Sequence, residues 1–252
     1  MRARERALLE PAFMLHGRDW HNTSRIVELF SRSHGRITLI ARGARRPTSP
    51  WRALLMPFRP LLVSFTLRGE LGFLASVEAA SAPLEPTPDR LLAGFYANEL
   101  LLRGMSPHDP HPDLFDHYGS LLADLAGDED EAVLLRRFEL GLLEALGYGT
   151  RLDHDGASGA PLDADAWYRI DPLAGPRRVD RVAETAGNDD DCCRGGDLMA
   201  LAAGKPSSTA ARGTLRRALR GALDQALGSR PLRSRAVARA LRRGPKVGEG
   251  AA

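Results

Sequence analysis

An arginine-rich turn is the part of this sequence whose residue types and spacing best fit a binding function. Arg42, Arg45 and Arg46 lie close together beside a glycine and a proline, directly after a run of β-forming residues. Glycine and proline favour a turn, so the three guanidinium groups are presented at a strand end instead of on a helix face. Because each guanidinium is a permanent cation with several N–H donors, the turn predicts contact with an anionic partner.

Catalytic motifs are missing from the sequence. Gly204-Lys205 is followed by Pro206, and Met199 stands where a phosphate-binding P-loop needs its first glycine. The GASG of residues 156–159 lacks the spacing of a nucleophile elbow, and no spacing forces two acidic residues together. We therefore predict that the protein is not an enzyme.

Metal and cofactor sites are also not expected. Cys192 and Cys193 are adjacent, so they cannot join distant segments or supply a four-ligand site. His154 between two aspartates, and the pair His108 and His111, are alternative ligands, but both clusters lie beside turn-forming residues and neither completes a ligand set. The sequence predicts no metal and no cofactor.

Charge is distributed unevenly along the 252 residues, although the net charge is only +3. Residues 1–80 carry 13 Arg against six acidic residues, net +7; residues 81–200 carry ten Arg against 24, net −14; residues 201–252 carry 12 basic residues against two, net +10. Two basic ends favour an extended polyanion such as nucleic acid as partner. Alternatively, arginine simply replaces lysine as the solubilising charge.

The hydrophobic residues, 43% of the chain, suffice for one or two ordinary cores. No run is long enough for a membrane span, and the amino terminus does not resemble a signal peptide. We expect a soluble protein in the cytoplasm, associated with the nucleoid.

Five β-rich runs within the first 80 residues predict a small barrel, because no long helix separates them. The expected strands are residues 12–16, 24–32, 37–40, 61–66 and 71–78, with a loop at 17–23 and one helical turn at 51–56.

Helical periodicity begins at residue 89. We expect one helix there, a second from Pro112 and a third over residues 131–146, packed as an antiparallel bundle. Residues 148–197 form a loop-rich insert with one short strand near 166–170, partly mobile over 183–196. Two Arg-rich helices follow, one over 209–227 and one capped by Ser234.

Taken together, these segments resemble the RecO family of bacterial recombination mediators over nearly the whole chain. The resemblance rests on the order and spacing of GRDWHNTSRIVELFSRSHGRITLIARGARR, MPFRPLLVSFTLRGELGFLASVE, YANELLLR, LRRFELGLLEALGYG and LGSRPLRSRAV. It implies an α+β protein, in which a five-stranded OB-fold barrel at residues 1–80 precedes a mainly helical domain at 81–243. The insert at about 148–197 belongs to that domain, and a disordered tail at 244–252 follows.

The resemblance also implies function and partners. These are binding of single- and double-stranded DNA, annealing of complementary strands, and action with RecR to load RecA on DNA coated by single-strand-binding protein. Many family members hold a zinc ion through four cysteines in the insert, whereas residues 152–176 contain none. We therefore expect no zinc, and an insert held by packing of Trp167 and Tyr168.

Candidate DNA-binding residues combine cations for phosphates with aromatic rings for bases. On the barrel they are Arg25, Arg36, Arg42, Arg45, Arg46, Trp20 and Trp51. Phe65 and Phe73 are assigned to the barrel core, and packing of either tryptophan on the barrel is an alternative to stacking. A second basic surface is expected on the last helices at Arg216, Arg220, Arg235 and Arg239; a solvated helix face is the alternative.

A partner site is expected on the third helix. Arg136 and Arg137 beside Phe138 fit a receptor for the acidic, apolar tail of single-strand-binding protein. In the alternative, Phe138 is a core residue. Rival functions are an RNA-binding OB-fold protein, an adaptor that binds acidic protein tails, and a metal-dependent nuclease.

Overall fold

The computed structural model describes residues 5–148, 151–171, 174–179, 192–203, 205, 208–228 and 230–242. The chain divides into two compact units. Unit 1 consists of Met1–Asp128 with Arg230–Ala252, and unit 2 of Glu129–Ser229. Unit 1 is therefore discontinuous in sequence, because its last helix is separated from its other elements by the whole of unit 2.

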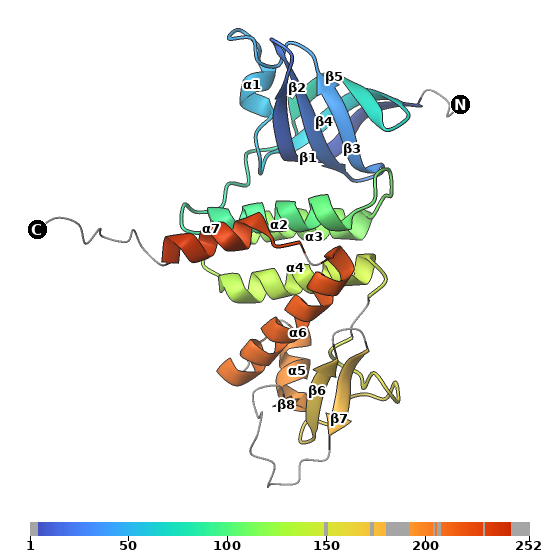
Figure 1. The fold of residues 1–252 in the computed structure, drawn as a ribbon, viewed down its shortest axis with the longest axis vertical. Coiled ribbons are helices and arrows are strands. Elements are labelled where there is room, and N and C mark those ends of the chain that lie inside the picture. Colours follow the sequence, from blue (N-terminus) through green and yellow to red (C-terminus); the bar gives the residue numbers. More distant parts are fainter. Residues whose placement is uncertain are drawn as a thin grey trace, which may run out of the picture. The chain divides into compact units, whose positions relative to one another are not determined.

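A closed five-stranded barrel forms the first part of unit 1 (Figure 1). Its strands are β1 (Glu5–Trp20), β2 (Ser24–Ser31), β3 (Gly35–Ala41), β4 (Pro60–Arg68) and β5 (Leu71–Ala79), in the order β1-β2-β3-β5-β4. All neighbours are antiparallel except β3 and β5, whose parallel pairing involves Thr38–Ile40 and Leu71–Phe73. The five strands confirm the predicted barrel.

β1 is much longer than the predicted strand at residues 12–16. Its first half pairs with β4, and its second half pairs with β2, so one strand serves two neighbours. A register shift between Ala7 and Glu10 bends the strand, and Leu9 there has a positive φ of 49°. The expected loop at 17–23 is wrong in its first part, because the polar residues up to Trp20 pair along the backbone of β2.

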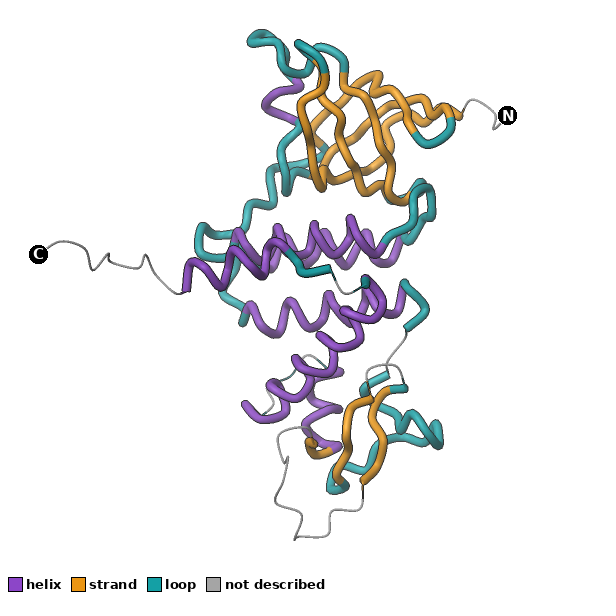
Figure 2. The backbone as a smooth tube through the Cα atoms, viewed as in Figure 1, coloured by secondary structure: helices purple, strands orange, loops and turns teal. Residues whose placement is uncertain are grey.

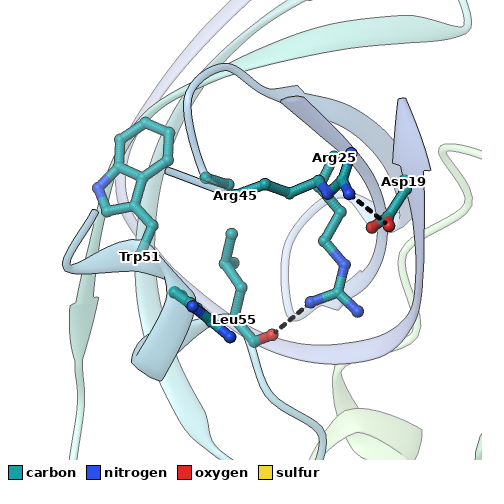
Figure 3. Close-up of a pocket in the computed structure, with 7 residues that line it drawn as sticks. Asp19, Arg25, Arg45, Trp51 and Leu55 are labelled. Carbon is teal, nitrogen blue, oxygen red and sulfur yellow. Dashed lines mark hydrogen bonds and ion pairs between the residues drawn. The ribbon is translucent and has the colours of Figure 1, made fainter. Parts of the chain in front are cut away.

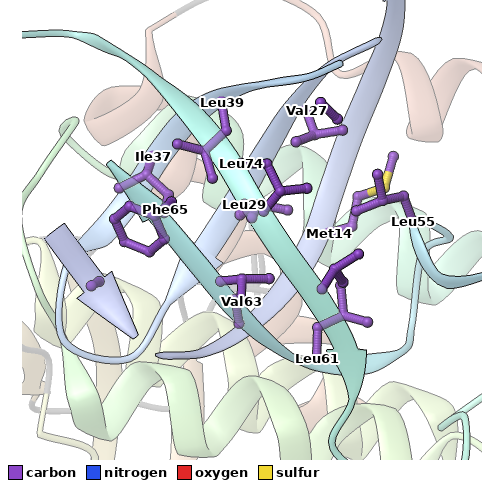
Figure 4. Packing of buried hydrophobic residues seen from close by; sticks show 14 of the residues in the cluster. Met14, Val27, Leu29, Ile37, Leu39, Leu55, Leu61, Val63, Phe65 and Leu74 are labelled. Carbon is purple, nitrogen blue, oxygen red and sulfur yellow. The ribbon is translucent and has the colours of Figure 1, made fainter. Parts of the chain in front are cut away.

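Alternate residues of the strands fill the barrel. Val27 and Leu29 of β2, with Ile37 and Leu39 of β3, are at most 1% exposed and point into this core (Figure 4). The short helix α1 (Trp51–Leu54) packs against the same core, as does buried Leu55, which follows it.

Two helices of unit 1 pack on the barrel and on each other through polar and aromatic contacts. They are α2 (Leu91–Gly104) and α3 (Pro112–Asp124). The rings of Phe13 and Phe115 lie 5.1 Å apart between centroids, and buried Tyr118 completes the contact. The Tyr118 hydroxyl donates to Oδ1 of Asn98, whose Nδ2 donates to the Leu15 carbonyl at 3.1 Å.

The last helix, α7 (Arg233–Arg242), lies along α2 within unit 1 (Figure 1). The Glu99 carboxylate accepts hydrogen bonds from the backbone N–H groups of Arg233 and Ser234, each at 2.9 Å, and from the Ser234 hydroxyl at 2.7 Å. Arg103, one turn further along α2, donates to the carbonyls of Arg230 and Pro231. The start of α7 is thus held by Glu99. The prediction that Ser234 is the N-cap was wrong, because α7 already begins at Arg233 and the Ser234 hydroxyl donates to Glu99.

The described residues of unit 2 form three helices and a small sheet. The helices are α4 (Glu131–Ala145), α5 (Gly195–Ala202) and α6 (Thr209–Leu227), and the strands are β6 (Trp167–Asp171), β7 (Gly175–Val179) and β8 (Cys192–Arg194), in the order β7-β6-β8. Figure 2 draws the strands of this sheet in orange and the helices in purple. α4 belongs to unit 2 whereas α2 and α3 belong to unit 1, so the predicted bundle is divided between the units.

The insert is more regular than predicted. One strand was expected near 166–170, and β6 confirms it, but β7, β8 and α5 were not predicted. The expected mobile stretch at 183–196 is wrong at its end, where β8 and α5 begin; residues 183–191 and the expected tail lie outside the described residues. Within the described part of the chain, no helix combines the length and apolarity needed to span a membrane.

Candidate nucleic-acid interface

Residues 42–46, the Arg turn, follow β3 directly. Gly43 has a positive φ of 71°, a conformation that side chains with a Cβ rarely adopt, and this lets the chain reverse there. The Arg45 backbone N–H donates to the Thr23 carbonyl at 2.9 Å. The Arg turn is therefore fastened to the loop between β1 and β2, and the two segments form one edge of the barrel mouth.

The Arg45 side chain strengthens this connection. Its guanidinium lies 3.1 Å from the Asp19 carboxylate and donates to the His21 carbonyl at 3.1 Å. His21 itself has a positive φ of 51°, which is uncommon for a residue other than glycine. Arg45 thus holds a strained loop in place while part of its side chain, 39% exposed, remains open to solvent.

A pocket of about 330 Å³ lies at this mouth. Its lining residues are Asp19, Arg25, Ala44, Arg45, Trp51, Arg52 and Leu55. In Figure 3, Trp51 lies on one side of the pocket, with Asp19 and Arg25 on the other. Three guanidinium groups face a single carboxylate, so the lining carries a net positive charge of two beside an indole ring. Such a lining suits an anion that also carries a flat apolar group.

Two neighbouring residues on α1 give the pocket its indole ring and an exposed cation. Trp51 is half-buried because it packs against the barrel core, so its ring is held in place. Arg52 is exposed, and its side chain has no hydrogen-bond or ion-pair partner among the described residues. Arg52 was not predicted as a binding residue from the sequence, although its position directly after Trp51 in a proline-rich connection could have indicated it.

Arg25 points inward at the end of the barrel, because it shares the inward face of β2 with Val27 and Leu29. It is half-buried, and its Nη1 donates to the Leu55 carbonyl at 3.3 Å. This hydrogen bond joins β2 to the end of α1, so Arg25 has a structural part as well as a place in the pocket.

The remaining predicted residues at the mouth are exposed. Arg42 places its guanidinium carbon 4.6 Å from the centre of the Phe73 ring, an arrangement that fits a cation–π contact. Phe73 is half-buried and outside the barrel core, so its assignment to that core was wrong, whereas Phe65 is 1% exposed within it. Trp20, 38% exposed, lies edge-on to His21, and Arg46 is exposed on the Arg turn.

Arg36 is not one of the exposed cations at the barrel mouth. Its Nη1 lies 3.1 Å from the Glu28 carboxylate, and its Nε donates to the Met105 carbonyl at 3.0 Å. Only 20% of its side chain is exposed. The charge of Arg36 is therefore neutralised across the β2–β3 hairpin, and the structure gives it a stabilising position instead of a free phosphate contact.

The predicted basic residues of the last helices divide between the units. In unit 1, Arg235 donates to the Tyr96 hydroxyl at 2.8 Å and covers its ring, while Arg239 is exposed. In unit 2, Arg216 and Arg220 are exposed on α6, with Asp224 4.0 Å from Arg220. Arg239, Arg216 and Arg220 remain the open cations of this set.

The expected partner site on α4 is not an open groove. Phe138 is 2% exposed, so its ring belongs to the core of unit 2, which was the alternative interpretation. Arg136 is paired at 2.7 Å with Glu139, which is fully buried, and Arg137 is paired at 3.0 Å with Glu129. Neither cation stands beside an accessible apolar surface formed by Phe138.

The described residues of the insert do not offer a fitting set of zinc ligands. No group of three or more His, Cys, Asp or Glu side chains gathers in a way that would hold a metal among the described residues. Burial, with the nearby Asp197 charge, raises the pKa of the Cys193 thiol to about 12, whereas a zinc ligand is a thiolate. The Asp155 carboxylate instead accepts backbone N–H bonds from Ala157, Ser158 and Arg178. These hydrogen bonds join the 155–158 turn to β7.

These features define the class of protein before any comparison. A closed five-stranded barrel with strand order β1-β2-β3-β5-β4 is an OB fold, and the helices that follow make the chain an α+β protein of the OB-fold class.

Comparison with known proteins gives the family. Residues 6–83 match the family model "Recombination protein O N terminal", and residues 85–236 match "Recombination protein O C terminal". The DNA repair protein RecO of Alkalilimnicola ehrlichii is 44% identical over 96% of this chain and 95% of its own length. The proteins of the same name from Methylococcus capsulatus and Azoarcus sp. are 41% and 39% identical over 93% and 96% of this chain, and 94% and 99% of their own lengths. The chain belongs to the RecO family of DNA repair proteins.

Proposed function

We propose that this protein is a recombination mediator that binds single- and double-stranded DNA and anneals complementary strands without turnover of nucleotide. The observation that carries the proposal is the barrel mouth, where Arg52 is exposed beside a pocket lined by Trp51, and Arg42 and Arg46 are exposed on the Arg turn. Binding of single strands without reading sequence requires cations that follow the backbone and rings on which bases stack. The mouth supplies both within a few residues of the chain.

The affinity for DNA is expected to depend strongly on salt. Each phosphate that an arginine neutralises releases counterions, which gives a slope of roughly −0.7 in log K against log salt on single strands. Three exposed arginines at the mouth therefore predict a contribution of roughly −2 to that slope.

Annealing requires that two polyanions be screened together. Arg216 and Arg220 of unit 2, with Arg239 of α7 in unit 1, provide exposed cations on elements other than the barrel. We propose that they contact the second strand or the duplex product, and that RecR, single-strand-binding protein and RecA act with this protein in loading RecA. The OB-fold resemblance and the family membership support these partners.

The decisive measurement is the rate at which two complementary labelled oligonucleotides anneal at moderate salt, without nucleotide or metal. The test variant carries Arg42→Ala, Arg46→Ala and Arg52→Ala. The control variant removes the same number of charges from the small sheet and insert of unit 2, at Arg151, Arg169 and Arg177. We expect the wild type and the control to accelerate annealing and the test variant to lose most of the acceleration. Equal activity of the two variants would remove the barrel mouth from the proposal.

An RNA-binding function is the second candidate, because phosphates and bases are common to both nucleic acids. Competition between DNA and RNA strands of one sequence separates the two, since only a site that contacts the 2′-hydroxyl distinguishes them. We expect RNA to compete no better than DNA.

A further inference from the structure

The shape of the mouth pocket suggests more than a general DNA surface. Buried Ala44 and Leu55 line it together with Trp51, so its apolar lining belongs to the well-packed part of the barrel. A polynucleotide that only passed over the mouth would leave this hollow empty. Its volume of about 330 Å³ falls at the small end of the range typical of sites for small organic molecules.

The polar groups around the pocket are already oriented. Asp19 and the His21 carbonyl fix the Arg45 guanidinium, and the Leu55 carbonyl fixes that of Arg25. Groups held in position before binding lose little conformational freedom when a ligand arrives. Arg52, which is exposed and has no side-chain partner among the described residues, can move to meet a phosphate at the entrance.

We infer that the pocket captures one nucleotide of a bound single strand, with the base against the Trp51 ring and its phosphate at Arg52 and Arg45. This inference rests on the proposed single-strand binding and gives it a defined subsite. Three cations and one carboxylate suit the phosphate, and the indole suits the base. A base can enter only after leaving the stack, so the pocket fixes the strand at one nucleotide.

The test uses 12-residue oligonucleotides that are abasic at every position or at all positions but one. Because a strand can slide, the single base can reach the pocket from any interior position. Stacking on an aromatic ring contributes roughly 1–3 kcal/mol per base, so the single base should raise the affinity of the wild type by about fivefold or more. Placing the base at an interior position or at either end separates capture of an interior nucleotide from capture of a strand end.

Two variants locate the effect. Ala44→Leu places a larger side chain in the pocket lining and should abolish the gain from the single base, measured as the ratio of the affinities for the one-base and abasic strands. Trp20→Ala removes the other predicted stacking ring, which lies outside the pocket lining, and should leave the gain intact. Arg46→Ala is the matched charge control and should weaken both oligonucleotides equally.

A fluorescence measurement does not depend on any change to the pocket. The chain contains three tryptophans, so the double variant Trp20→Phe/Trp167→Phe reports on Trp51 alone. Its emission should be quenched by the one-base oligonucleotide and not by the abasic one. The inference is overturned if the single base adds no affinity, if Ala44→Leu keeps the gain while Trp20→Ala loses it, or if Trp51 emission does not distinguish the two oligonucleotides. Failure of the wild type to bind even an intact 12-residue strand would instead overturn the proposed function, and this inference with it.

Discussion

Arg36 shows how a single arginine can be part of the fold and not of the binding surface. Its contacts with Glu28 and the Met105 carbonyl join β2, β3 and the segment after α2. Hydrogen bonds to charged groups contribute about 1.5–3 kcal/mol each when they are partly shielded from water.

We therefore predict that Arg36→Ala lowers the free energy of unfolding by about 1.5–3 kcal/mol and leaves the salt dependence of DNA binding unchanged. Urea denaturation and a salt titration of binding measure the two effects. Glu28→Gln is the matched control, because it weakens the same ion pair from the other side. A reduced salt slope of DNA binding with normal stability would mean that Arg36 contacts DNA.

Asp155 holds the insert of unit 2 through its carboxylate. Backbone N–H groups of Ser158 and Arg178 donate to it, and these bonds lower its pKa to about 2. Because the folded pKa lies below the usual carboxyl value, this stabilisation is complete above about pH 4 and is lost as the pH falls toward 2.

Asp155→Asn should loosen the insert at neutral pH, since an amide nitrogen would face the N–H donors in place of one carboxylate oxygen. Hydrogen exchange of the amides of Ala157, Ser158 and Arg178 is the measurement, and these amides should exchange faster in the variant. Lowering the pH of the wild type from 4 to 2 should likewise reduce the protection factors of these amides, once their rates are corrected for the intrinsic pH dependence of exchange. Asp163→Asn is the control within the same insert. Unchanged protection in Asp155→Asn would show that packing of Trp167 and Tyr168 is sufficient.

Among the helices, the attachment of α7 to α2 depends on Glu99. Burial alone would raise the pKa of this carboxyl, but hydrogen bonds from Ser234 and Arg233 and the charge of Arg103 outweigh burial and lower it. The attachment is therefore strongest above the usual carboxyl pKa and weakens as the pH falls below it.

Glu99→Ala should release the start of α7 at a cost of about 1–2 kcal/mol, the usual range for loss of a helix cap. Glu99→Gln, which keeps one acceptor oxygen, should have a smaller effect. Limited proteolysis at residues 230–242 is the readout, and equal cleavage of the wild type and Glu99→Ala would refute the prediction.

The elements also show which parts of the fold can be predicted from sequence. Alternating β-formers predicted β2, β3 and β5 closely, because these strands have one buried face. β7, with the sequence GPRRV, has no alternation, and β8 pairs with a strand more than 20 residues away, so neither carries a local signal. The same limit applies to the site. Turn-forming residues were enough to predict the Arg turn. The contact of Arg36 with Glu28 was not predictable, because it depends on the register of the hairpin, and the contact of Arg45 with Asp19 depends on the geometry of the loop.

The uneven charge distribution along the chain separates the requirement for single-strand binding from the requirement for annealing. Single-strand affinity is expected from the barrel mouth, whereas annealing also needs cations that reach a second strand. We predict that Arg216→Ala, Arg220→Ala and Arg239→Ala together slow annealing by about tenfold and change single-strand affinity by less than about threefold. Stopped-flow annealing and a direct binding titration measure the two quantities. Parallel loss of both would mean that one continuous surface serves both tasks.

The discontinuity of unit 1 has a consequence for how the protein is made. α2 leaves the ribosome before unit 2, and the helix that packs on it, α7, is synthesised only after residues 129–229. At roughly 5–20 residues per second, α2 waits about 7–28 s until α7 is complete. During that interval Glu99 and Arg103 have no helix start to hold, and the face of Tyr96 that Arg235 later covers is open. The nascent chain therefore presents an unfinished surface to chaperones until its last helix arrives.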